Sequence, residues 1–124
     1  AVNDLEKQGM TSLIIDLRDN GGGLLDTCTD MLSRLVEKDK LLVYTKDKEG
    51  NKEEFKSDSA KTVDIPIVLL VNGNTASASE IMTGCLKDYG KATVVGTKTF
   101  GKGIVQSIMP LPDGSAVKFT IASY

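Results

Sequence analysis

PIVLLVNGNTASASEIMTGCLKDYG, residues 66–90, is the stretch that decides the fold class of this 124-residue chain. Residues 66–71 form an uninterrupted apolar run, which is typical of a strand buried on both faces. Between residues 76 and 89 apolar side chains recur every three or four positions, which predicts an amphipathic helix that Gly90 ends. A buried strand that turns directly into such a helix predicts an α/β fold.

The segments before this stretch follow the same pattern. Residues 12–17 are predicted to form a second buried strand, and three successive glycines follow at positions 21–23. Residues 1–9 are typical of the last turns of a helix that a glycine closes. A further amphipathic helix is predicted over residues 24–36, because its apolar residues recur at helical spacing: Leu24, Leu25, Cys28, Met31, Leu32, Leu35 and Val36.

The remaining segments predict strands. Residues 41–45 and 52–56 flank a polar turn and predict a hairpin, whose charged second arm indicates an exposed edge. Residues 92–96 predict a short strand, and residues 104–111 and 116–121 predict two more that a tight turn joins. The order of all these elements predicts a mixed sheet flanked by helices.

Composition excludes several classes of function. Apolar residues make up 40% of the chain and charged residues 26%, with a net charge of −2, which fits a globular domain and gives no basic excess for nucleic acid. No apolar run is long enough to span a bilayer. The chain contains no histidine, which excludes a Ser-His-Asp triad and histidine-ligated zinc within it, and no metal or cofactor is expected. Cys28 and Cys85 form no CxxC pair and are expected to be buried thiols.

Ser77 stands where the buried strand of residues 66–71 gives way to a helix. Chemistry in α/β folds is concentrated at the carboxyl ends of strands, and the free N–H groups at a helix N-terminus can bind an oxyanion. A nucleophilic serine at this point would have the N–H of Ala78 beside it. The segment from Ser77 to Glu80 also matches S-x-x-E, a capping box, and the local pattern by itself favours that structural interpretation.

A lysine between two glycines, in Phe100-Gly101-Lys102-Gly103, is the second candidate. Apolar neighbours such as Phe100 disfavour the charged form of an amine, and a neutral amine at Lys102 could accept the proton of a serine, as histidine does elsewhere. An exposed loop lysine is the commoner alternative. Gln106, four residues later in an apolar strand, could orient the amine or face solvent.

The run of glycines supplies the third candidate. The N–H groups of Gly22 and Gly23 precede a helix and can point at an anion, although a tight turn explains the glycines equally well. The run is neither GxGxxG nor a P-loop, so phosphate binding is not indicated. Asp88 lies eleven residues after Ser77, about three helical turns away, and is expected to be structural.

Taken in order, three separated segments resemble the carboxyl-terminal processing proteases, also called tail-specific proteases, which are the S41 serine peptidases. The segments are DLRDNGGGL at residues 16–24, VNGNTASASEI at residues 71–81 and GTKTFGKGIVQ at residues 96–106. The resemblance covers nearly the whole chain, and three motifs at fitting intervals are far more specific than one.

This resemblance implies a role for each candidate residue. Ser77 matches the family's nucleophile, Lys102 its general base, and Gln106 the residue that assists the lysine. The N–H of Ala78, together with that of Gly22 or Gly23, matches the oxyanion hole. Asp88 matches a helical aspartate with a supporting role at most.

The resemblance also implies a fold and an activity. It implies a ClpP/crotonase-like core and a serine endopeptidase that cleaves proteins or peptides near their C-termini through a Ser-Lys dyad and an acyl-enzyme. Family members normally carry a PDZ domain and further flanking segments, so residues 1–124 are expected to be the catalytic core alone. The implied location is periplasmic, cell-envelope or secreted. Two alternatives share the fold: a crotonase-like acyl-thioester enzyme and an inactive binding module.

Overall fold

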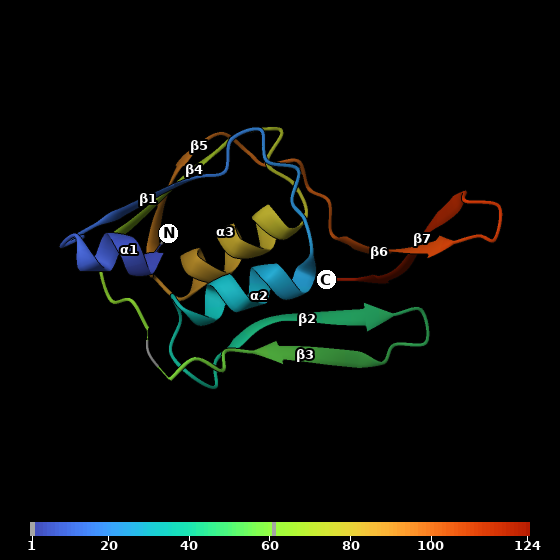
Figure 1. Ribbon diagram of the computed structural model, residues 1–124, viewed down its shortest axis with the longest axis horizontal. Coiled ribbons are helices and arrows are strands. Elements are labelled where there is room, and N and C mark those ends of the chain that lie inside the picture. The colour runs from blue at the N-terminus through green and yellow to red at the C-terminus, as the bar shows by residue number, and fades with distance from the viewer. Residues whose placement is uncertain (1, 61) are drawn as a thin grey trace.

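A computed structural model describes residues 2–60 and 62–124 and shows three layers: a parallel sheet, a pair of helices and a β-hairpin (Figure 1). The elements in chain order are α1 (Val2–Lys7), β1 (Leu13–Asp16), α2 (Leu25–Ser33), β2 (Leu41–Asp47), β3 (Lys52–Lys56), β4 (Ile67–Val71), α3 (Ala78–Asp88), β5 (Ala92–Gly96), β6 (Ile104–Pro110) and β7 (Ala116–Ser123).

The parallel sheet has the strand order β1-β4-β5, so β4 is its central strand. α2 and α3 lie on one side of this sheet (Figure 1). Alternate residues of β4 are buried, whereas Ile14 of β1 is 67% exposed. The expectation that residues 12–17 are buried on both faces is therefore wrong at Ile14, because successive side chains of a strand point to opposite faces and the two helices cover only one of them.

The core lies between the parallel sheet and the two helices. The helices α2 and α3 and the strand β4 each contribute one fully buried leucine: Leu32, Leu86 and Leu69, respectively. Cys28 and Cys85 are free, buried thiols as expected, and burial raises the pKa of both to about 11. These thiols therefore behave as small apolar groups.

The helix predicted over residues 24–36 is shorter, because α2 ends at Ser33. Leu24 and Met31 belong to its predicted apolar face but are 76% and 49% exposed. The spacing of apolar residues indicates which of them share a helix face, but not how far the neighbouring elements extend over that face.

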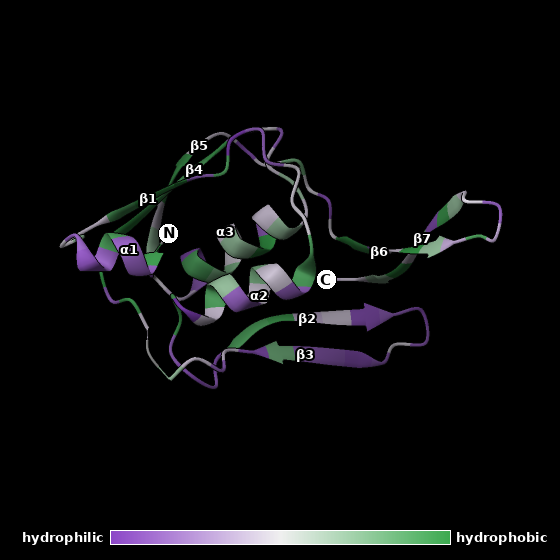
Figure 2. Ribbon diagram, viewed as in Figure 1, coloured by the Kyte–Doolittle hydropathy of each residue, from purple (hydrophilic) through white to green (hydrophobic). Residues whose placement is uncertain are grey.

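The antiparallel strands form a second sheet with the order β3-β2-β7-β6, and both predicted hairpins are confirmed. β3 is an edge strand, as its charge indicates, and the outer half of the β2–β3 hairpin is hydrophilic (Figure 2). The β6–β7 hairpin extends away from the helices (Figure 1) and exposes apolar side chains such as Ile108 and Met109.

The α/β class is confirmed. The parallel strands form one sheet, β1-β4-β5, and the antiparallel strands form the other, β3-β2-β7-β6. Within residues 2–60 and 62–124, no helix has the length and apolar character needed to cross a membrane.

Candidate active site

Ser77 forms a sharp turn between the end of β4 and the first residue of α3. Its backbone angles are φ 58° and ψ −124°, which place a residue with a Cβ in the left-handed half of backbone space. An N-cap residue ordinarily adopts an extended conformation, and a strained backbone of this kind costs about 1–3 kcal/mol. Such a strand-to-helix turn holds a serine hydroxyl away from the backbone and exposes it, as in the nucleophile elbow of hydrolases.

The interpretation of Ser77 as the N-cap of a capping box is confirmed. Ser77 is the N-cap of α3, and its backbone N–H donates a hydrogen bond to Glu80 Oε2 at 2.9 Å. The Ser77 hydroxyl lies 2.6 Å from the hydroxyl of Tyr124, at the end of β7. Among the described residues, its side-chain partner is thus Tyr124 and not Lys102, and no local signal in the sequence pointed to this tyrosine.

One cavity of about 370 Å³ brings most of the candidate residues together. Ser77 and Ala78 reach it from the start of α3, Lys102 from the loop before β6, and Gln106 from β6 itself. Lys102 and Gln106 are both half-buried there. The remaining walls are mainly apolar and come from Gly23, Leu24, Leu25, Ile81, Ile104, Val105, Ile108, Lys118 and Tyr124.

One expectation about this site needs correction. Phe100, expected to desolvate the lysine, is 68% exposed and does not line the cavity, whose apolar walls come from α2, α3 and β6 instead. Asp88, the exposed last residue of α3, lines a second cavity of about 620 Å³ between β2 and α3, which Lys102 and Tyr124 also line but Ser77 does not. The chain therefore places Asp88 apart from Ser77, in agreement with its structural interpretation.

Gly22 is held against the turn that carries Ser77. Its φ is +91°, and a Cβ at this position would lie 2.7 Å from the carbonyl oxygen of Ala76 and 2.8 Å from the backbone nitrogen of Ala78. Only glycine fits so close to another backbone. Its N–H already donates to Asn20 Oδ1 at 3.0 Å. Of the two candidate glycines, Gly23 lines the cavity, whereas Gly22 does not and allows the close approach of the two backbones.

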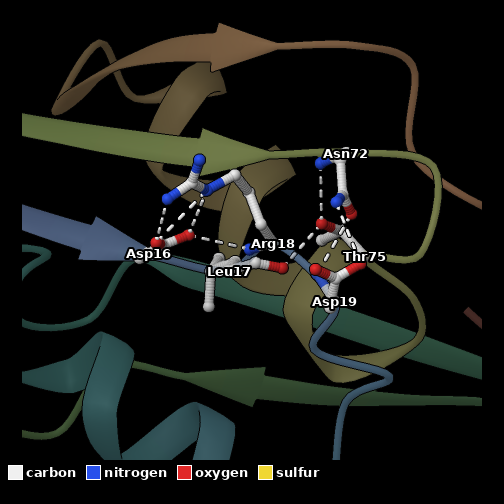
Figure 3. Close-up of polar contacts among 6 residues, drawn as sticks. All are labelled: Asp16, Leu17, Arg18, Asp19, Asn72 and Thr75. Atoms are coloured by element: carbon white, nitrogen blue, oxygen red, sulfur yellow. Dashed lines mark hydrogen bonds and ion pairs between the residues drawn. The ribbon is translucent and has the colours of Figure 1, made fainter.

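A hydrogen-bond network joins the end of β1 to the loop before Ser77 (Figure 3). Asp19 Oδ1 accepts hydrogen bonds from the side-chain amides of Asn72, at 3.0 Å, and Asn74, at 2.8 Å. Thr75 is fully buried, and its hydroxyl donates to the carbonyl oxygen of Leu17 at 2.7 Å and accepts from the Asn72 N–H at 3.0 Å. These contacts fix the glycine run relative to Ser77.

Asp16 and Arg18 form a separate ion pair at the end of β1, with Arg18 Nη2 2.7 Å from Asp16 Oδ2 (Figure 3). The hydrogen bonds from Arg18 lower the pKa of Asp16 to about 2, and those from Asn74 and Asn72 lower the pKa of Asp19. Both carboxylates are thus ionised and engaged in local contacts.

Glu80 has a second role that the capping box did not reveal. Its carboxylate accepts hydrogen bonds from the backbone N–H groups of Gly101, at 2.7 Å, and Lys102, at 2.8 Å, in addition to that of Ser77. Burial opposes its ionisation, but these bonds and one from the Thr99 side chain outweigh burial and lower the pKa of Glu80. One carboxylate therefore joins the start of α3 to the segment that carries Lys102.

The fold and this site together define an α/β protein with a half-buried serine on a strained turn at the carboxyl end of a parallel sheet. The chain belongs to peptidase family S41, whose family model matches residues 1–124.

Similar proteins agree with this assignment. The chain is 46% identical over 124 residues to the carboxyl-terminal-processing protease of Synechocystis sp. and 47% identical over 126 residues to carboxyl-terminal-processing peptidase 3, chloroplastic, of Arabidopsis thaliana, and both comparisons cover all of this chain. The solved structure of a photosystem II D1 C-terminal processing protease superposes with a TM-score of 0.84 at 40% identity, covering 99% of this chain and 32% of that one. The chain spans 29% of the Synechocystis relative and 24% of the Arabidopsis relative.

Proposed function

We propose that residues 1–124 form the catalytic core of a serine endopeptidase that cleaves protein or peptide substrates near their C-termini. The observation that carries the proposal is the shared cavity, onto which a serine on a strained turn, a half-buried lysine and a glutamine all open. The names of the relatives point to the same reaction, since they describe carboxyl-terminal processing.

In the proposed reaction, Ser77 Oγ attacks the carbonyl carbon of the scissile peptide bond, and its proton passes to the neutral amine of Lys102. Lys102 then returns this proton to the leaving nitrogen, so that an acyl-enzyme on Ser77 and a free amine result. Water, activated by the same amine, hydrolyses the ester. Gln106 lines the same cavity, and its amide oxygen is suited to orient the amine.

The Ser77 hydroxyl must leave Tyr124 before this transfer. A rotation about χ1 of Ser77 moves its oxygen between staggered positions at low cost, and catalytic hydrogen bonds commonly tighten only when the substrate is bound. The contact with Tyr124 thus represents the hydroxyl at rest.

The backbone N–H groups of Ala78 and Gly23 are the proposed oxyanion hole. Ala78 is the first residue of α3, where the helix N-terminus provides free donors and a partial positive charge. We assign the second donor to Gly23 rather than Gly22, whose N–H is already bound to Asn20. A donor of this kind contributes about 3–4 kcal/mol to stabilisation of the transition state.

The test is cleavage of an unfolded protein, reduced β-casein, by the full-length protein. Ser77→Ala should abolish cleavage and acyl-enzyme formation, whereas the fold should survive, because loss of a cap costs about 1 kcal/mol. Lys102→Ala and Lys102→Arg should both be inactive, since a guanidinium stays protonated.

Lys98→Ala is the matched control for the lysine, because Lys98 lies in the same loop and is exposed. Retained turnover in Lys102→Arg would remove Lys102 as the base. Loss of activity in Ser79→Ala with full activity in Ser77→Ala would show that the nucleophile is Ser79.

Family membership favours the peptidase over the crotonase-like alternative, which would not need a serine and a lysine at this spacing. Binding of an acyl-thioester by the Ser77→Ala variant would favour the alternative. We further propose a location outside the cytosol. Its support is that the Arabidopsis relative is named as chloroplastic, and fractionation of cells that contain the protein would test it.

A further inference from the structure

Tyr124 engages the Ser77 hydroxyl through a short hydrogen bond. The two hydroxyl oxygens lie 2.6 Å apart, near the lower end of the range for O–H···O bonds. Burial raises the pKa of the Tyr124 phenol above its ordinary value despite the hydrogen bond to Ser77, so the phenol is protonated at neutral pH. A phenol is a stronger acid than an aliphatic hydroxyl and therefore the better donor, which makes Tyr124 the donor and Ser77 Oγ the acceptor.

This hydrogen bond occupies the atom that the proposed reaction uses. Ser77 Oγ accepts the phenolic proton with a lone pair, and attack on a carbonyl carbon needs a lone pair of the same oxygen. The contact also holds Oγ beside Tyr124, whereas proton transfer to Lys102 needs hydrogen-bond reach between Oγ and the amine. While the phenol is bound, the serine is held back from reaction.

Tyr124 is anchored where it meets the serine. Its backbone N–H donates to the carbonyl oxygen of Gly103 at 3.1 Å, and its side chain packs against the hydrophobic core. The preceding residue, Ser123, pairs with Ile104 of β6. Release of the contact is therefore a change of the Ser77 rotamer, which costs little, and not a movement of the tyrosine.

The tyrosine stands where two cavities share a wall. It lines both the cavity that contains Ser77 and the cavity of about 620 Å³ between β2 and α3, and the other described residues common to both are Ile81 and Lys102. A peptide in the Ser77 cavity lies against this wall, and its backbone carries a carbonyl oxygen at every residue. Such an oxygen can accept the phenolic hydrogen bond in place of Ser77 Oγ.

We propose that Tyr124 is a positioning residue that keeps the Ser77 hydroxyl unreactive in the empty site and releases it when a carbonyl oxygen of the substrate backbone accepts the phenolic hydrogen bond. The inference rests on the proposed function, since it needs Ser77 as the nucleophile. Binding of a peptide thereby becomes a condition for reaction, and the serine is protected from other acyl compounds. One hydrogen bond of ordinary strength shifts such an equilibrium about two- to tenfold.

The test compares two reactions of the full-length protein: acylation by p-nitrophenyl acetate, which has no peptide backbone, and cleavage of a β-casein peptide. In acylation, Ser77 Oγ bonds to the acetyl carbon, its proton passes to Lys102 and p-nitrophenolate leaves. Tyr124→Phe keeps the ring and removes the hydroxyl, so the Ser77-dependent first turnover should be about three- to tenfold faster. On the peptide, kcat/KM should stay within about twofold, because release of the serine is offset by loss of the contact with the substrate carbonyl.

Tyr89→Phe is the matched control. The Tyr89 phenol donates to the carbonyl oxygen of Leu41 at 2.7 Å and does not line the Ser77 cavity, so its loss should leave both rates within about twofold. Ser77→Ala supplies the background from other nucleophilic side chains. As an independent measurement, fluorine NMR of the protein labelled with meta-fluorotyrosine should show one tyrosine resonance that shifts in Ser77→Ala, and the absence of any shift would contradict the hydrogen bond.

The outcomes separate the two proposals. Peptide cleavage that persists in Ser77→Ala would overturn the proposed function itself. Cleavage that requires Ser77, with acylation in Tyr124→Phe no faster than in the wild type, would overturn the role of Tyr124 and leave the peptidase intact. A gain on the peptide as large as that on the ester would overturn the exchange with a substrate carbonyl.

Discussion

Two loops reach the cavity that contains Ser77, and they are held in different ways. The glycine loop (residues 17–24) is fixed by several contacts spread over its length, including the Thr75 hydroxyl on Leu17, the Asn72 and Asn74 amides on Asp19, and the Ala76 N–H on the carbonyl oxygen of Asn20 at 3.0 Å. In the lysine loop (residues 97–103), one carboxylate, that of Glu80, accepts three hydrogen bonds, and the loop's other contacts are backbone hydrogen bonds at Thr97, Phe100 and Gly103.

The difference concerns how each loop would respond to the loss of a single group. In the glycine loop, removal of one partner leaves the others in place, and the exposed ones can rebind water at small cost. In the lysine loop, three hydrogen bonds, from Thr99, Gly101 and Lys102, weaken at once if Glu80 loses its charge. One further contact, from the Phe100 N–H to the carbonyl oxygen of Thr75 at 2.9 Å, connects the lysine loop to the glycine loop through Thr75.

The largest effect is expected from Gly22→Ala. At this position the glycine loop packs directly against the backbone before α3, and no other contact can compensate for a side chain there. The new Cβ would collide with the backbone of Ala76 and Ala78. The alanine would also have to keep the φ of +91° that glycine has at this position. We expect kcat/KM of the full-length protein on β-casein peptides to fall at least about 100-fold, because a shift of about 1 Å beside a reacting group has effects of that size. Gly21→Ala is the control: nothing lies within 4 Å of its Cβ, and it should stay within about threefold of wild type.

Glu80→Gln should reduce kcat about tenfold by loosening the lysine loop. The amide keeps one acceptor oxygen but loses the charge that strengthens its hydrogen bonds to Gly101, Lys102 and Ser77. Hydrogen exchange at the Gly101 and Lys102 amides should become faster, while the glycine loop stays protected. Glu53→Gln, on the exposed edge strand β3, should change neither quantity. Equal loosening of both loops would show that Glu80 does not act on one of them selectively.

Thr75→Val removes the hydroxyl of the residue that both loops contact, while the backbone carbonyl that accepts from the Phe100 N–H of the lysine loop stays. The valine keeps the shape of threonine but leaves the buried Leu17 carbonyl and the Asn72 N–H without the hydroxyl. Chemical denaturation should show a loss of about 1–3 kcal/mol in the free energy of unfolding, with a smaller fall in kcat than for Glu80→Gln. Thr75→Ser should recover most of the loss, and full stability of Thr75→Val would contradict the assigned role of the hydroxyl.

Acid should release the lysine loop gradually. The pKa of Glu80 is lower in the folded protein than its ordinary value, so its contribution to stability is fully present above that ordinary value and is lost as the pH falls through the lowered folded pKa. Amide exchange at Gly101, corrected for its intrinsic pH dependence, should therefore show falling protection below about pH 4.5. In Glu80→Gln this dependence should disappear, and its persistence there would assign it to another group.

The smallest effect is expected from Asn74→Ala in the glycine loop. Asn74 is exposed and gives one of several hydrogen bonds to Asp19, so the free energy of unfolding should fall by less than about 1 kcal/mol and kcat should stay within about twofold. A loss as large as that in Glu80→Gln would show that the glycine loop, too, depends on a single contact.

The sequence by itself determined the local structure. The 3.6-residue and two-residue periodicities, the glycines after helices and the polar turns located the strands and helices, and Ser77 was placed correctly at the start of α3. These features depend on neighbours within a few residues, which is why they can be predicted from short segments. Recognition of the family needed three separated motifs, and their order was also available in the sequence.

Only the tertiary structure decided how these segments meet. Glu80 contacts a loop 21 and 22 residues away, and Ser77 contacts Tyr124 47 residues away, in each case because separate elements pack against the start of α3. The exposure of Leu24, Met31 and Phe100 depends in the same way on which neighbours reach them. A side chain's periodicity fixes the direction in which it points, but its burial, its partners and the cavity that it lines result from contacts between residues distant in the chain.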